Sequence, residues 1–454
     1  PFKTIAEFRE ESTTTMAPPR FSEVFIAVMK IVLINTSENR GGAAVACKRL
    51  MIALKKQGIS VKMLVRDKQT TDPDVISIGE SKNRKWINRV RFVYERLVIG
   101  LNNFFSRKNL FAVSIANTGM NITKLKEVKE ADIIHLHWIN QGMLSLKDIH
   151  RLVELGKPMV WTMHDMWPCT GICHHARDCS HYTQNCGNCF FLKLSGNKDL
   201  SYRVFQKKLR VGYENILFVA CSDWLRSRTE KSSLLKYSKV VTIPNPLDTN
   251  LFSPLDKLEV RKRLGLSMDS YFLLFGAAKV GDVRKGFEYY FEALRLLNRA
   301  IPELRGRLEL IFMGEAGLEI PQDIPYPAHF TGFLTDEEKI ADWYNAASLF
   351  VLPSLEENLP NMIMESMACG TPVVGFDTGG IPEMIDHKYN GYVARYKDSH
   401  DLMKGICWLL NQADIQEVSE NARKKVVDYY SEKLIAERFS QLYSELLSYK
   451  NRTK

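Results

Sequence analysis

Two glutamates near the C-terminal end of the chain have the types and spacing of a ligand-binding pair. Glu357 and Glu365 are separated by seven residues within the segment 354–383. On one continuous helix, eight steps of about 100° would put them about 80° apart, away from a shared stripe. Pro360 favours a different arrangement, because proline prefers the first position of a helix. We therefore predict that Glu357 lies in a loop and Glu365 in the helix that follows.

The residues after Glu365 predict where this helix ends. Ala368-Cys369-Gly370 supplies a glycine for the C-terminal cap, and residues 372–376 are typical of a buried strand. The N–H groups and dipole at the start of the helix attract phosphate, and carboxylates bind hydroxyl groups. The unit therefore suits a nucleotide diphospho-sugar. The alternative is an ordinary strand–loop–helix unit with incidental glutamates.

This segment resembles the donor signature of the family 4 glycosyltransferases. The resemblance is carried by the spacing of Glu357 and Glu365, by Met-Ala-Cys-Gly-Thr-Pro-Val-Val at 367–374, and by Gly379-Gly380. That family consists of retaining enzymes with the GT-B fold. The resemblance implies that Glu357 lies near the transferred sugar and that Glu365 holds the ribose of the nucleotide.

The loop after the first glutamate departs from the family pattern. The family usually has Glu-Gly-Phe-Gly-Leu, whereas residues 357–361 are Glu-Asn-Leu-Pro-Asn. Because Pro360 has no N–H group, amide contacts to the sugar would come from Asn361 and Met362. The departure concerns the identity of the donor more than the class of reaction.

Cations follow the first strand expected in the C-terminal half. They can neutralise a leaving diphosphate, and an arginine can bind it through two N–H groups. The family pattern is an arginine followed, several residues later, by a Lys-Gly pair. Lys285-Gly286 matches the pair, and either Lys279 or Arg284 takes the place of the arginine. The alternative is a basic turn in contact with water.

Two N-terminal features also resemble this family. Gly41 and Gly42 follow the expected first strand and open a helix, where small residues let a substrate approach the backbone; they match the glycine loop that faces donor and acceptor. His164 ends another expected strand and matches a Thr-x-His motif whose histidine lies beside the donor sugar. A tight turn and a structural histidine are the alternatives. His135 and His137 face one side of a strand and are more typical of buried, hydrogen-bonded residues than of ligands.

Four cysteines form the most unusual pattern of the N-terminal half. Cys173, Cys179, Cys186 and Cys189 are spaced by five, six and two residues, with histidines among them. The C-x-x-C end has the spacing of a metal knuckle, and four thiolates suit tetrahedral Zn²⁺. We predict a structural zinc, or another thiophilic metal, on a loop near the cleft. Disulfides in an oxidised sample and free thiols are the alternatives.

The composition is that of a globular protein with two or more domains. The chain has 454 residues, of which 45% are hydrophobic and 25% charged. The formal charge of +10 favours acidic partners, but the sequence has no helix-turn-helix, zinc-finger or RNA-binding signature. We therefore expect a nucleotide-sugar or an anionic membrane as partner, and no nucleic acid. Without an export signal, the expected location is the cytoplasm.

One basic segment has the pattern of an amphipathic helix. Residues 82–108 contain eight lysines and arginines against a single acid, Glu95. The apolar residues that recur at helical spacing are Trp86, Val90, Val93, Leu97, Leu101 and Phe104. Such a helix can lie on an anionic membrane, here the inner face of the cell membrane. The alternative is a helix that packs this stripe on a sheet while its charges face water.

Short β-branched runs alternate with helical stretches from Met29 onward, which predicts parallel sheets covered by helices on both faces. The expected strands are Lys30–Asn35, Val61–Arg66, Asp132–His137, Met159–His164, Leu217–Cys221, Val240–Pro244, Tyr271–Ala277, Leu308–Gly314, His329–Phe333, Ser348–Pro353, Pro372–Phe376 and Gly391–Ala394. Two rounds of alternation indicate an α/β protein with two doubly wound, Rossmann-like domains, and the resemblance implies that they face a central cleft in a GT-B fold.

The expected organisation has four parts. They are a leader outside the fold (1–28), an N-terminal acceptor-side domain with a cysteine-rich loop at 169–189 (29–245), a C-terminal nucleotide-sugar domain (246–430) and a terminal helix that crosses back to the first domain (431–454).

The resemblance implies a retaining hexosyltransferase that uses a nucleotide diphospho-sugar and needs no catalytic cofactor. Lys285, Arg284 and the helix N-terminus would stabilise the leaving diphosphate. Glu357 and His164 would position the sugar, and Glu365 the ribose. The expected acceptor is a carbohydrate or a lipid-linked saccharide in surface polysaccharide biosynthesis. The alternatives are a sugar-nucleotide epimerase and a nucleotide-sugar-binding protein without transferase activity.

Overall fold

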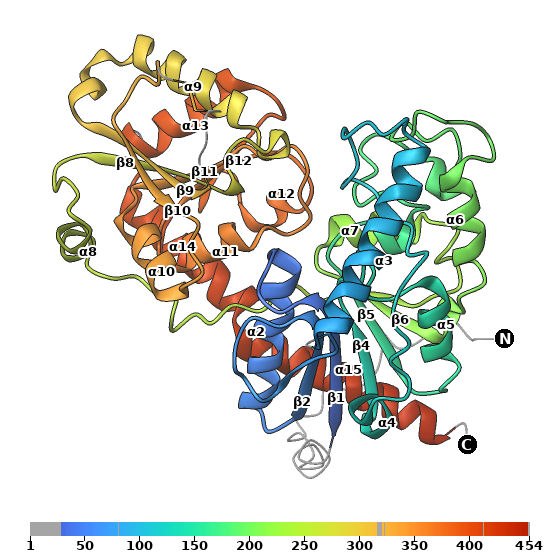
Figure 1. Cartoon of the computed structure of the whole chain (residues 1–454). Coiled ribbons are helices and arrows are strands. Elements are labelled where there is room, and N and C mark those ends of the chain that lie inside the picture. The colour runs from blue at the N-terminus through green and yellow to red at the C-terminus, as the bar shows by residue number, and fades with distance from the viewer. Residues whose placement is uncertain (1–28, 80, 316–319, 322, 412, 453–454) are drawn as a thin grey trace, which may run out of the picture.

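The chain folds into two lobes, each built on a parallel β-sheet (Figure 1). The computed structural model describes residues 29–79, 81–315, 320–321, 323–411 and 413–452, so the expected leader over residues 1–28 lies outside the described residues. All twelve expected strands form, and the prediction of two doubly wound α/β sheets is confirmed.

The first sheet has seven strands in the order β3-β2-β1-β4-β5-β6-β7. Their bounds are β1 Lys30–Ser37, β2 Ser60–Asp67, β3 Val75–Ser77, β4 Ile133–Leu136, β5 Met159–Met163, β6 Ile216–Ala220 and β7 Val240–Thr242. β1 lies inside the sheet between β2 and β4, and all its residues after Lys30 are buried, as expected of a strand covered on both faces. The three-residue edge strand β3 has too few residues for a recognisable sequence pattern.

Helices cover both faces of this sheet. They are α2 Gly42–Lys56, α3 Lys82–Leu101, α4 Lys126–Glu130, α5 Leu146–Val153, α6 Leu200–Lys208 and α7 Asp223–Glu230. Side chains fix where several of them begin. The Ser81 hydroxyl caps α3 and the Asp199 carboxylate caps α6, while Ser145 and Asp148 form a reciprocal capping box at the start of α5.

The second sheet has six strands in the order β10-β9-β8-β11-β12-β13. Their bounds are β8 Tyr271–Lys279, β9 Leu308–Glu315, β10 Ala328–Gly332, β11 Leu349–Leu352, β12 Val373–Phe376 and β13 Gly391–Ala394. The helices of this half are α8 Lys257–Leu264, α9 Phe287–Ala300, α10 Glu337–Ala346, α11 Asn361–Ala368, α12 Ile381–Met384, α13 Ser399–Asn411 and α14 Ile415–Tyr430.

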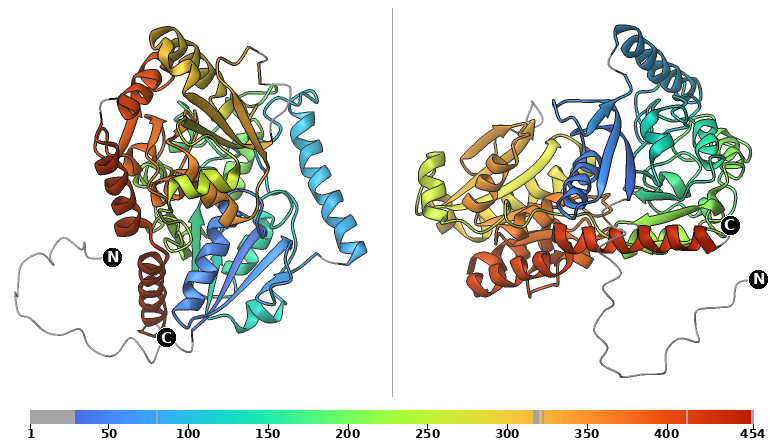
Figure 2. Two further views of the ribbon diagram at one scale, coloured as in Figure 1. Left: turned by 90° about the vertical axis from the view of Figure 1, so that its left-hand side faces the viewer. Right: turned by 90° about the horizontal axis from the view of Figure 1, so that it is seen from below.

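The last helix, α15 Glu432–Arg452, runs from the second lobe along the first (Figure 2). Its Ile435, Phe439 and Tyr443 belong to the same apolar core as Leu33 of β1 and Leu50 of α2. The Tyr443 hydroxyl also lies 2.7 Å from Nδ1 of a histidine on β4. The helix therefore ties the end of the chain to its first sheet. In the part of the chain that the structure describes, no helix is long and apolar enough to cross a bilayer.

Candidate active site

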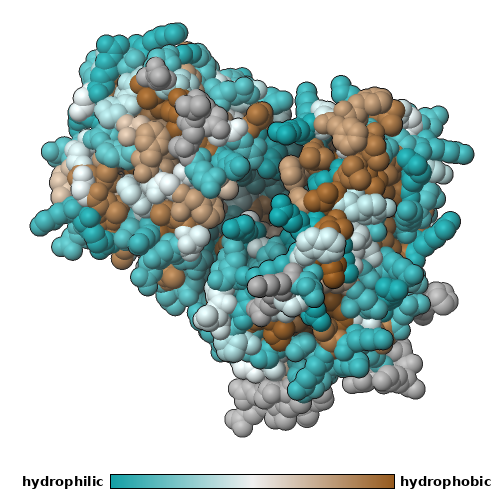
Figure 3. Space-filling model, viewed as in Figure 1, coloured by the Kyte–Doolittle hydropathy of each residue, from teal (hydrophilic) through white to brown (hydrophobic). Residues whose placement is uncertain are grey.

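A cleft of about 1650 Å³ lies between the two lobes, where strands of both sheets reach their carboxyl ends (Figure 3). This is where doubly wound sheets bind their ligands. Nine of the ten catalytic and donor-binding residues predicted from the sequence line it, namely Gly41, Gly42, His164, Lys279, Arg284, Lys285, Glu357, Asn361 and Met362. The tenth, Glu365, lies behind the cleft wall in contact with the other lobe.

The start of α11 forms one wall of the cleft. Glu357 lies in the loop before this helix and Glu365 within it, as predicted, and Pro360 is the residue at the N-cap. The N–H group of Ile363 is bonded to the Pro360 carbonyl, at 3.1 Å. The N–H groups of Asn361 and Met362 precede that bond, so they are available to an anion in the cleft.

The start of α2 faces the same space. Asn361 connects the two helices, because its side-chain amide donates to the carbonyl oxygen of Gly42 at 3.1 Å. Asn245, between the lobes, donates in turn to Oδ1 of Asn361 at 2.9 Å. Two helix N-termini therefore meet at one point of the cleft, and their dipoles both favour negative charge there.

The predicted cations differ in their partners. Nζ of Lys285 forms an ion pair with Oε1 of Glu357, and both side chains are partly buried. Arg284 is held by Asp282 through two contacts of 2.7 and 3.1 Å, which raise the pKa of this guanidinium. Lys285 is therefore the cation that lies directly beside the predicted sugar-binding carboxylate.

Close backbone contacts explain two glycines of the donor signature. Gly379 has φ +60°, and a Cβ atom there would lie 1.9 Å from the carbonyl oxygen of Glu357. The N–H group of Gly380 donates to the carbonyl of Asn358 at 2.8 Å. Gly286 has φ +67°, and a Cβ atom there would lie 1.9 Å from the carbonyl oxygen of Pro353. Larger residues at these positions would displace the loop that carries Glu357.

The N-terminal wall contains a contiguous group of three histidines, of which His135 and His137 are buried and His164 is partly buried. Nε2 of His164 lies 3.0 Å from Nδ1 of His137. His135 lies between the hydroxyl groups of Thr162 and Tyr443, each at 2.7 Å, so its expected role as a buried, hydrogen-bonded residue is confirmed. Burial lowers the pKa of His164 to about 4 and that of His135 to about 3. These side chains are neutral at physiological pH.

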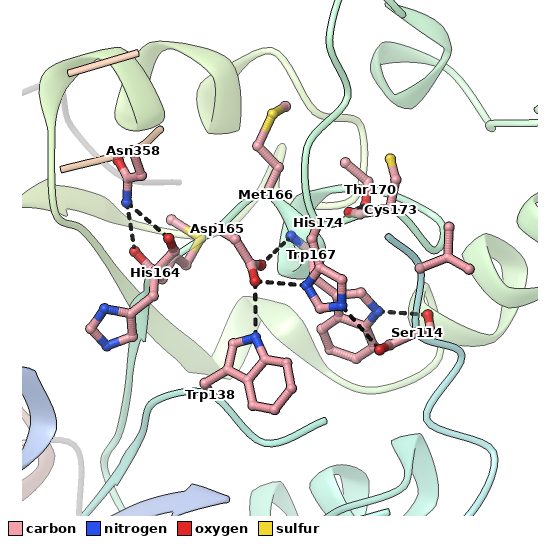
Figure 4. A network of polar contacts seen from close by, with 12 residues as sticks. Ser114, Trp138, His164, Asp165, Met166, Trp167, Thr170, Cys173, His174 and Asn358 are labelled. Carbon is pink, nitrogen blue, oxygen red and sulfur yellow. Dashed lines mark hydrogen bonds and ion pairs between the residues drawn. The ribbon is translucent and has the colours of Figure 1, made fainter. Parts of the chain in front are cut away.

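Asp165 organises a polar network that sequence reasoning missed (Figure 4). Its Oδ2 accepts hydrogen bonds from Trp138 Nε1 at 2.9 Å and from His174 Nδ1 at 2.6 Å, and its Oδ1 accepts from the Trp167 N–H group at 2.8 Å. Burial alone would raise the pKa of Asp165, but His174 and these hydrogen bonds lower it to about 2. The sequence contained one indication of this role, because Asp165 directly follows His164, a predicted site residue.

Asn358 fastens the donor loop to the end of β5 (Figure 4). Its amide donates to the carbonyl oxygens of Met163 and His164, at 3.4 and 3.3 Å, and its oxygen accepts from the Ser222 hydroxyl at 2.5 Å. The family pattern has glycine here. In this chain the asparagine side chain makes contacts between the lobes that glycine could not make, and they hold Glu357 opposite His164.

Comparison with known proteins agrees with this geometry. Residues 40–251 match the family Glycosyltransferase Family 4, and residues 272–412 match the family Glycosyl transferases group 1. The chain belongs to the family 4 glycosyltransferases. The two matches cover most of both sheets, and the prediction of a hexosyltransferase enzyme is confirmed.

Relatives of this glycosyltransferase are found among curated and solved proteins. D-inositol 3-phosphate glycosyltransferase of Thermobispora bispora is 27% identical over 342 residues, which cover 71% of this chain and 72% of that protein. Sucrose-phosphate synthase of Thermosynechococcus elongatus has a TM-score of 0.62 at 19% identity, covering 92% of this chain and 99% of that one. Alr3699/HepE of Anabaena, in complex with UDP-glucose, has a TM-score of 0.58 at 16% identity, covering 92% and 99%. The solved structures confirm the GT-B fold.

Glu365 of this glycosyltransferase is engaged by protein side chains. Nη2 of Arg49, on α2, lies 2.8 Å from its Oε1, and the Tyr344 hydroxyl donates to its Oε2 at 3.1 Å. Arg49 also contacts Glu337, at 2.6 Å. Burial would lower the pKa of Arg49, but the two glutamates raise it overall. A ribose bound to Glu365 would have to share this carboxylate with Arg49 and Tyr344.

The cysteine-rich loop of this glycosyltransferase does not form the predicted zinc site. No three His, Cys, Asp or Glu side chains in the described ranges are placed to hold a metal ion, and Cys173, Cys179, Cys186 and Cys189 are free. Burial raises the pKa of Cys186 to about 12 and that of Cys189 to about 11. Hydrogen bonds hold the loop instead, among them Cys189 N–H to Asp199 at 2.8 Å.

Proposed function

We propose that this protein is a retaining transferase that moves a sugar from a nucleotide diphospho-sugar to a carbohydrate or lipid-linked saccharide acceptor. The observation that carries the proposal is the Lys285–Glu357 ion pair, which lies in the cleft lined by the N-termini of α2 and α11. Diphosphate would be bound by the cation and the helix dipoles, and the sugar by the carboxylate. We extend the proposal to surface polysaccharide biosynthesis, with transfer at the membrane surface.

The reaction is a displacement at the anomeric carbon on the face of the leaving group. The bond between that carbon and the diphosphate oxygen breaks, and its electron pair leaves with the oxygen. The acceptor hydroxyl forms the new bond, and its proton passes to the departing phosphate. Lys285 and the N–H groups of Asn361 and Met362 would stabilise the charge that develops on the diphosphate.

His164 and Glu357 would position the transferred sugar from opposite walls. His164 is neutral, so it can exchange hydrogen bonds with sugar hydroxyls without adding charge to the cleft. The pair between Glu357 and Lys285 has to loosen when the donor binds, because both groups then gain a ligand partner. Glu365 would reach the ribose from behind this wall.

Uridine diphosphate sugars are the donors to test first. The solved structure of Alr3699/HepE of Anabaena contains UDP-glucose in the same fold. This supports a nucleotide-sugar donor for the present chain and gives UDP priority among the bases, while the Glu-Asn-Leu-Pro-Asn loop leaves the sugar to be found by assay.

The test is a thermal-shift panel of UDP-, GDP-, ADP- and dTDP-sugars. A donor that binds the folded state raises the unfolding midpoint by mass action. We expect one nucleotide family to stabilise the wild type and the control Lys262→Ala, an exposed lysine on α8, but not Lys285→Ala. Equal stabilisation of Lys285→Ala and wild type would contradict the proposed donor site.

Product analysis then separates the enzyme classes. Sugar transfer that requires an acceptor, with retained anomeric configuration, supports the proposal. Conversion of the nucleotide-sugar without acceptor would show an epimerase, and donor binding without turnover on a panel of acceptors would show a binding protein.

A further inference from the structure

The helix α3 exposes an apolar face. Trp86, Val93, Tyr94 and Leu101 are 67%, 54%, 52% and 51% exposed, and Val90 and Leu97 are exposed as well. Figure 2 shows the helix projecting from the body of the first lobe, and Figure 3 shows a band of apolar residues along it. An apolar stripe of this length in water marks an interaction surface.

Polar residues attach the opposite face of α3 to the protein. Glu95 is fully buried, and its Oε1 accepts from the N–H groups of Ile115 and Ala116 at 2.8 and 3.0 Å. Arg96 forms an ion pair of 3.0 Å with Glu95 and donates to backbone carbonyls of the same segment.

This attachment fixes which way the stripe faces. Nine helical steps of about 100° separate Trp86 from Glu95, so the stripe points about 180° away from the buried carboxylate. The alternative in which α3 packs its stripe on the sheet is therefore wrong.

The segment after α3 continues the surface. Phe104 and Phe105 are 69% and 64% exposed, and both adopt the left-handed conformation, with φ of 49° and 55°. This conformation is costly for aromatic residues, and it turns both rings toward solvent. Phe111 is 62% exposed as well, and its ring stacks on Phe92 of α3.

We propose that the outward face of α3, together with residues 102–111, docks on an anionic lipid bilayer. The charges around the stripe select this partner. Glu95 is the only acid between residues 82 and 108, and it is buried, so the exposed charges that the structure describes in this segment are all cationic. Among them, Arg107 and Lys108 follow the stripe directly, whereas Lys85 and Arg89 line the cleft. Cations attract the anionic headgroups while the apolar side chains enter the interface.

The same charges argue against a second copy of this chain as the partner. A symmetric dimer through α3 would bring like charges face to face, which costs free energy. A bilayer with anionic lipids supplies negative charge at its surface and an apolar layer beneath it. The cations and the apolar stripe of α3 are therefore both complementary to a membrane.

Docking would also place the cleft at the membrane, and this second step rests on the proposed function. Lys85, Asn88, Arg89 and Phe92 of α3 line the cleft, while the apolar stripe lies on the outer side of the same helix. A saccharide on a lipid carrier could therefore reach the cleft along α3 without leaving the bilayer. This explains why an acceptor-side helix carries both cations toward the cleft and apolar residues outward.

The experiment is co-sedimentation of the full chain with vesicles of phosphatidylcholine, with and without phosphatidylglycerol. The first variant combines Val93→Ser, Leu97→Ser and Leu101→Ser. Its matched control combines Leu255→Ser, Leu258→Ser and Tyr429→Ser, which change equally exposed apolar residues of the second lobe. We expect binding of the wild type and the control to anionic vesicles, and at least about a tenfold weaker partition for the α3 variant.

A charge variant tests the choice of lipid independently. Arg107→Glu with Lys108→Glu should abolish the preference for phosphatidylglycerol, and binding of the wild type should weaken as salt is raised. The control Arg299→Glu with Lys404→Glu, at exposed sites elsewhere, should keep the preference. Arg96 is unsuitable for this test because its buried ion pair holds the helix.

Three results would overturn the proposal. They are absence of wild-type binding to anionic vesicles, equal binding of the α3 serine variant and its control, and a wild-type dimer in sedimentation velocity that the same variant dissociates. The donor thermal shift is measured on the same proteins. Vesicle binding without any thermal shift by a donor would support the docking surface and contradict the proposed function. A thermal shift by a donor without vesicle binding would support the proposed function and contradict the docking surface.

Discussion

On the C-terminal wall of the cleft, Lys285 and Arg284 are paired with Glu357 and Asp282 at partly exposed positions. The N-terminal wall is different, because its histidines are buried or partly buried in contact with one another, and this keeps them neutral. The first wall thus consists of charges that a ligand can reach and rearrange. The second consists of polar groups whose charge state the fold has already set.

The difference follows from what each wall would have to do. A leaving diphosphate gains negative charge during transfer, so the donor wall needs cations that strengthen their contact as the bond breaks. The transferred sugar gains positive charge as the bond breaks, so the opposite wall needs shape and hydrogen bonds rather than further cations. A charged histidine there would compete with Lys285 for the carboxylate of Glu357.

The largest expected effect concerns Arg49, an exception to the contrast between the two walls. This charged side chain of α2 in the first lobe forms ion pairs with Glu365 and Glu337 of the second lobe. Arg49→Met would leave the largely buried Glu365 without its cation. We expect the free energy of unfolding in urea to fall by about 3–5 kcal/mol. The double variant Arg49→Met with Glu365→Gln should recover much of the loss. Equal stability of the two variants would show that this pair does not hold the lobes together.

Lys285→Ala tests the role of charge on the donor wall. Loss of one group that stabilises developing charge lowers kcat by about 10² to 10³-fold, and we expect this effect at Lys285. Arg284→Ala should lower kcat by less than about tenfold, because Asp282 already binds that guanidinium. Single-turnover kinetics with saturating donor makes the comparison. A larger effect at Arg284 would transfer the main phosphate contact to that residue.

Gly379→Ala tests whether the position of Glu357 on the donor wall matters, because it moves the loop without removing any functional group. The new Cβ atom would collide with the carbonyl of Glu357 and would also require φ +60° from an alanine. Because small displacements of a reacting group can cost about 10²-fold, we expect kcat/KM to fall by about 10 to 100-fold. Gly306→Ala is the matched control, since a Cβ atom there meets nothing within 4 Å. Similar activities of the two variants would exclude a positioning role for Gly379.

The fold and most of the donor wall were predictable from the sequence because their signals are local. Buried parallel strands are continuous apolar runs, and Pro360 marks the start of α11 within a few residues of both glutamates. Glu365 and Arg49 are 316 positions apart in the sequence, so no local sequence pattern could predict their ion pair.

Two other features show where a sequence pattern stops being informative. The periodicity of residues 86–101 predicts a stripe but does not say whether it faces the sheet or the solvent, which the buried pair of Glu95 and Arg96 decides. The spacing of the cysteines suits a metal, but the described residues contain no group of three side chains placed to hold one.

The neutral histidines of the N-terminal wall should make the free energy of unfolding depend on pH. The unfolded chain protonates its histidines near pH 6.5, whereas burial delays protonation of His164 until about pH 4 and of His135 until about pH 3. Below pH 6.5 the unfolded state therefore binds more protons, and the free energy of unfolding falls as the pH is lowered, by about 1.4 kcal/mol per pH unit for each such histidine.

Urea unfolding at about pH 7.5 and about pH 5 measures this effect when the wild type is compared with a histidine variant, because other groups such as Lys208, with a pKa of about 7, titrate equally in both proteins. Carboxylates with a lowered pKa, such as Asp165 and Glu38, both at about 2, lose their contribution only below about pH 4.5. His164→Asn removes one of the titrating groups, so its stability should change less over this interval than that of the wild type. An equal change in both proteins would mean that His164 is already accessible to protons in the folded state, and the contrast between the two walls would then rest on position alone.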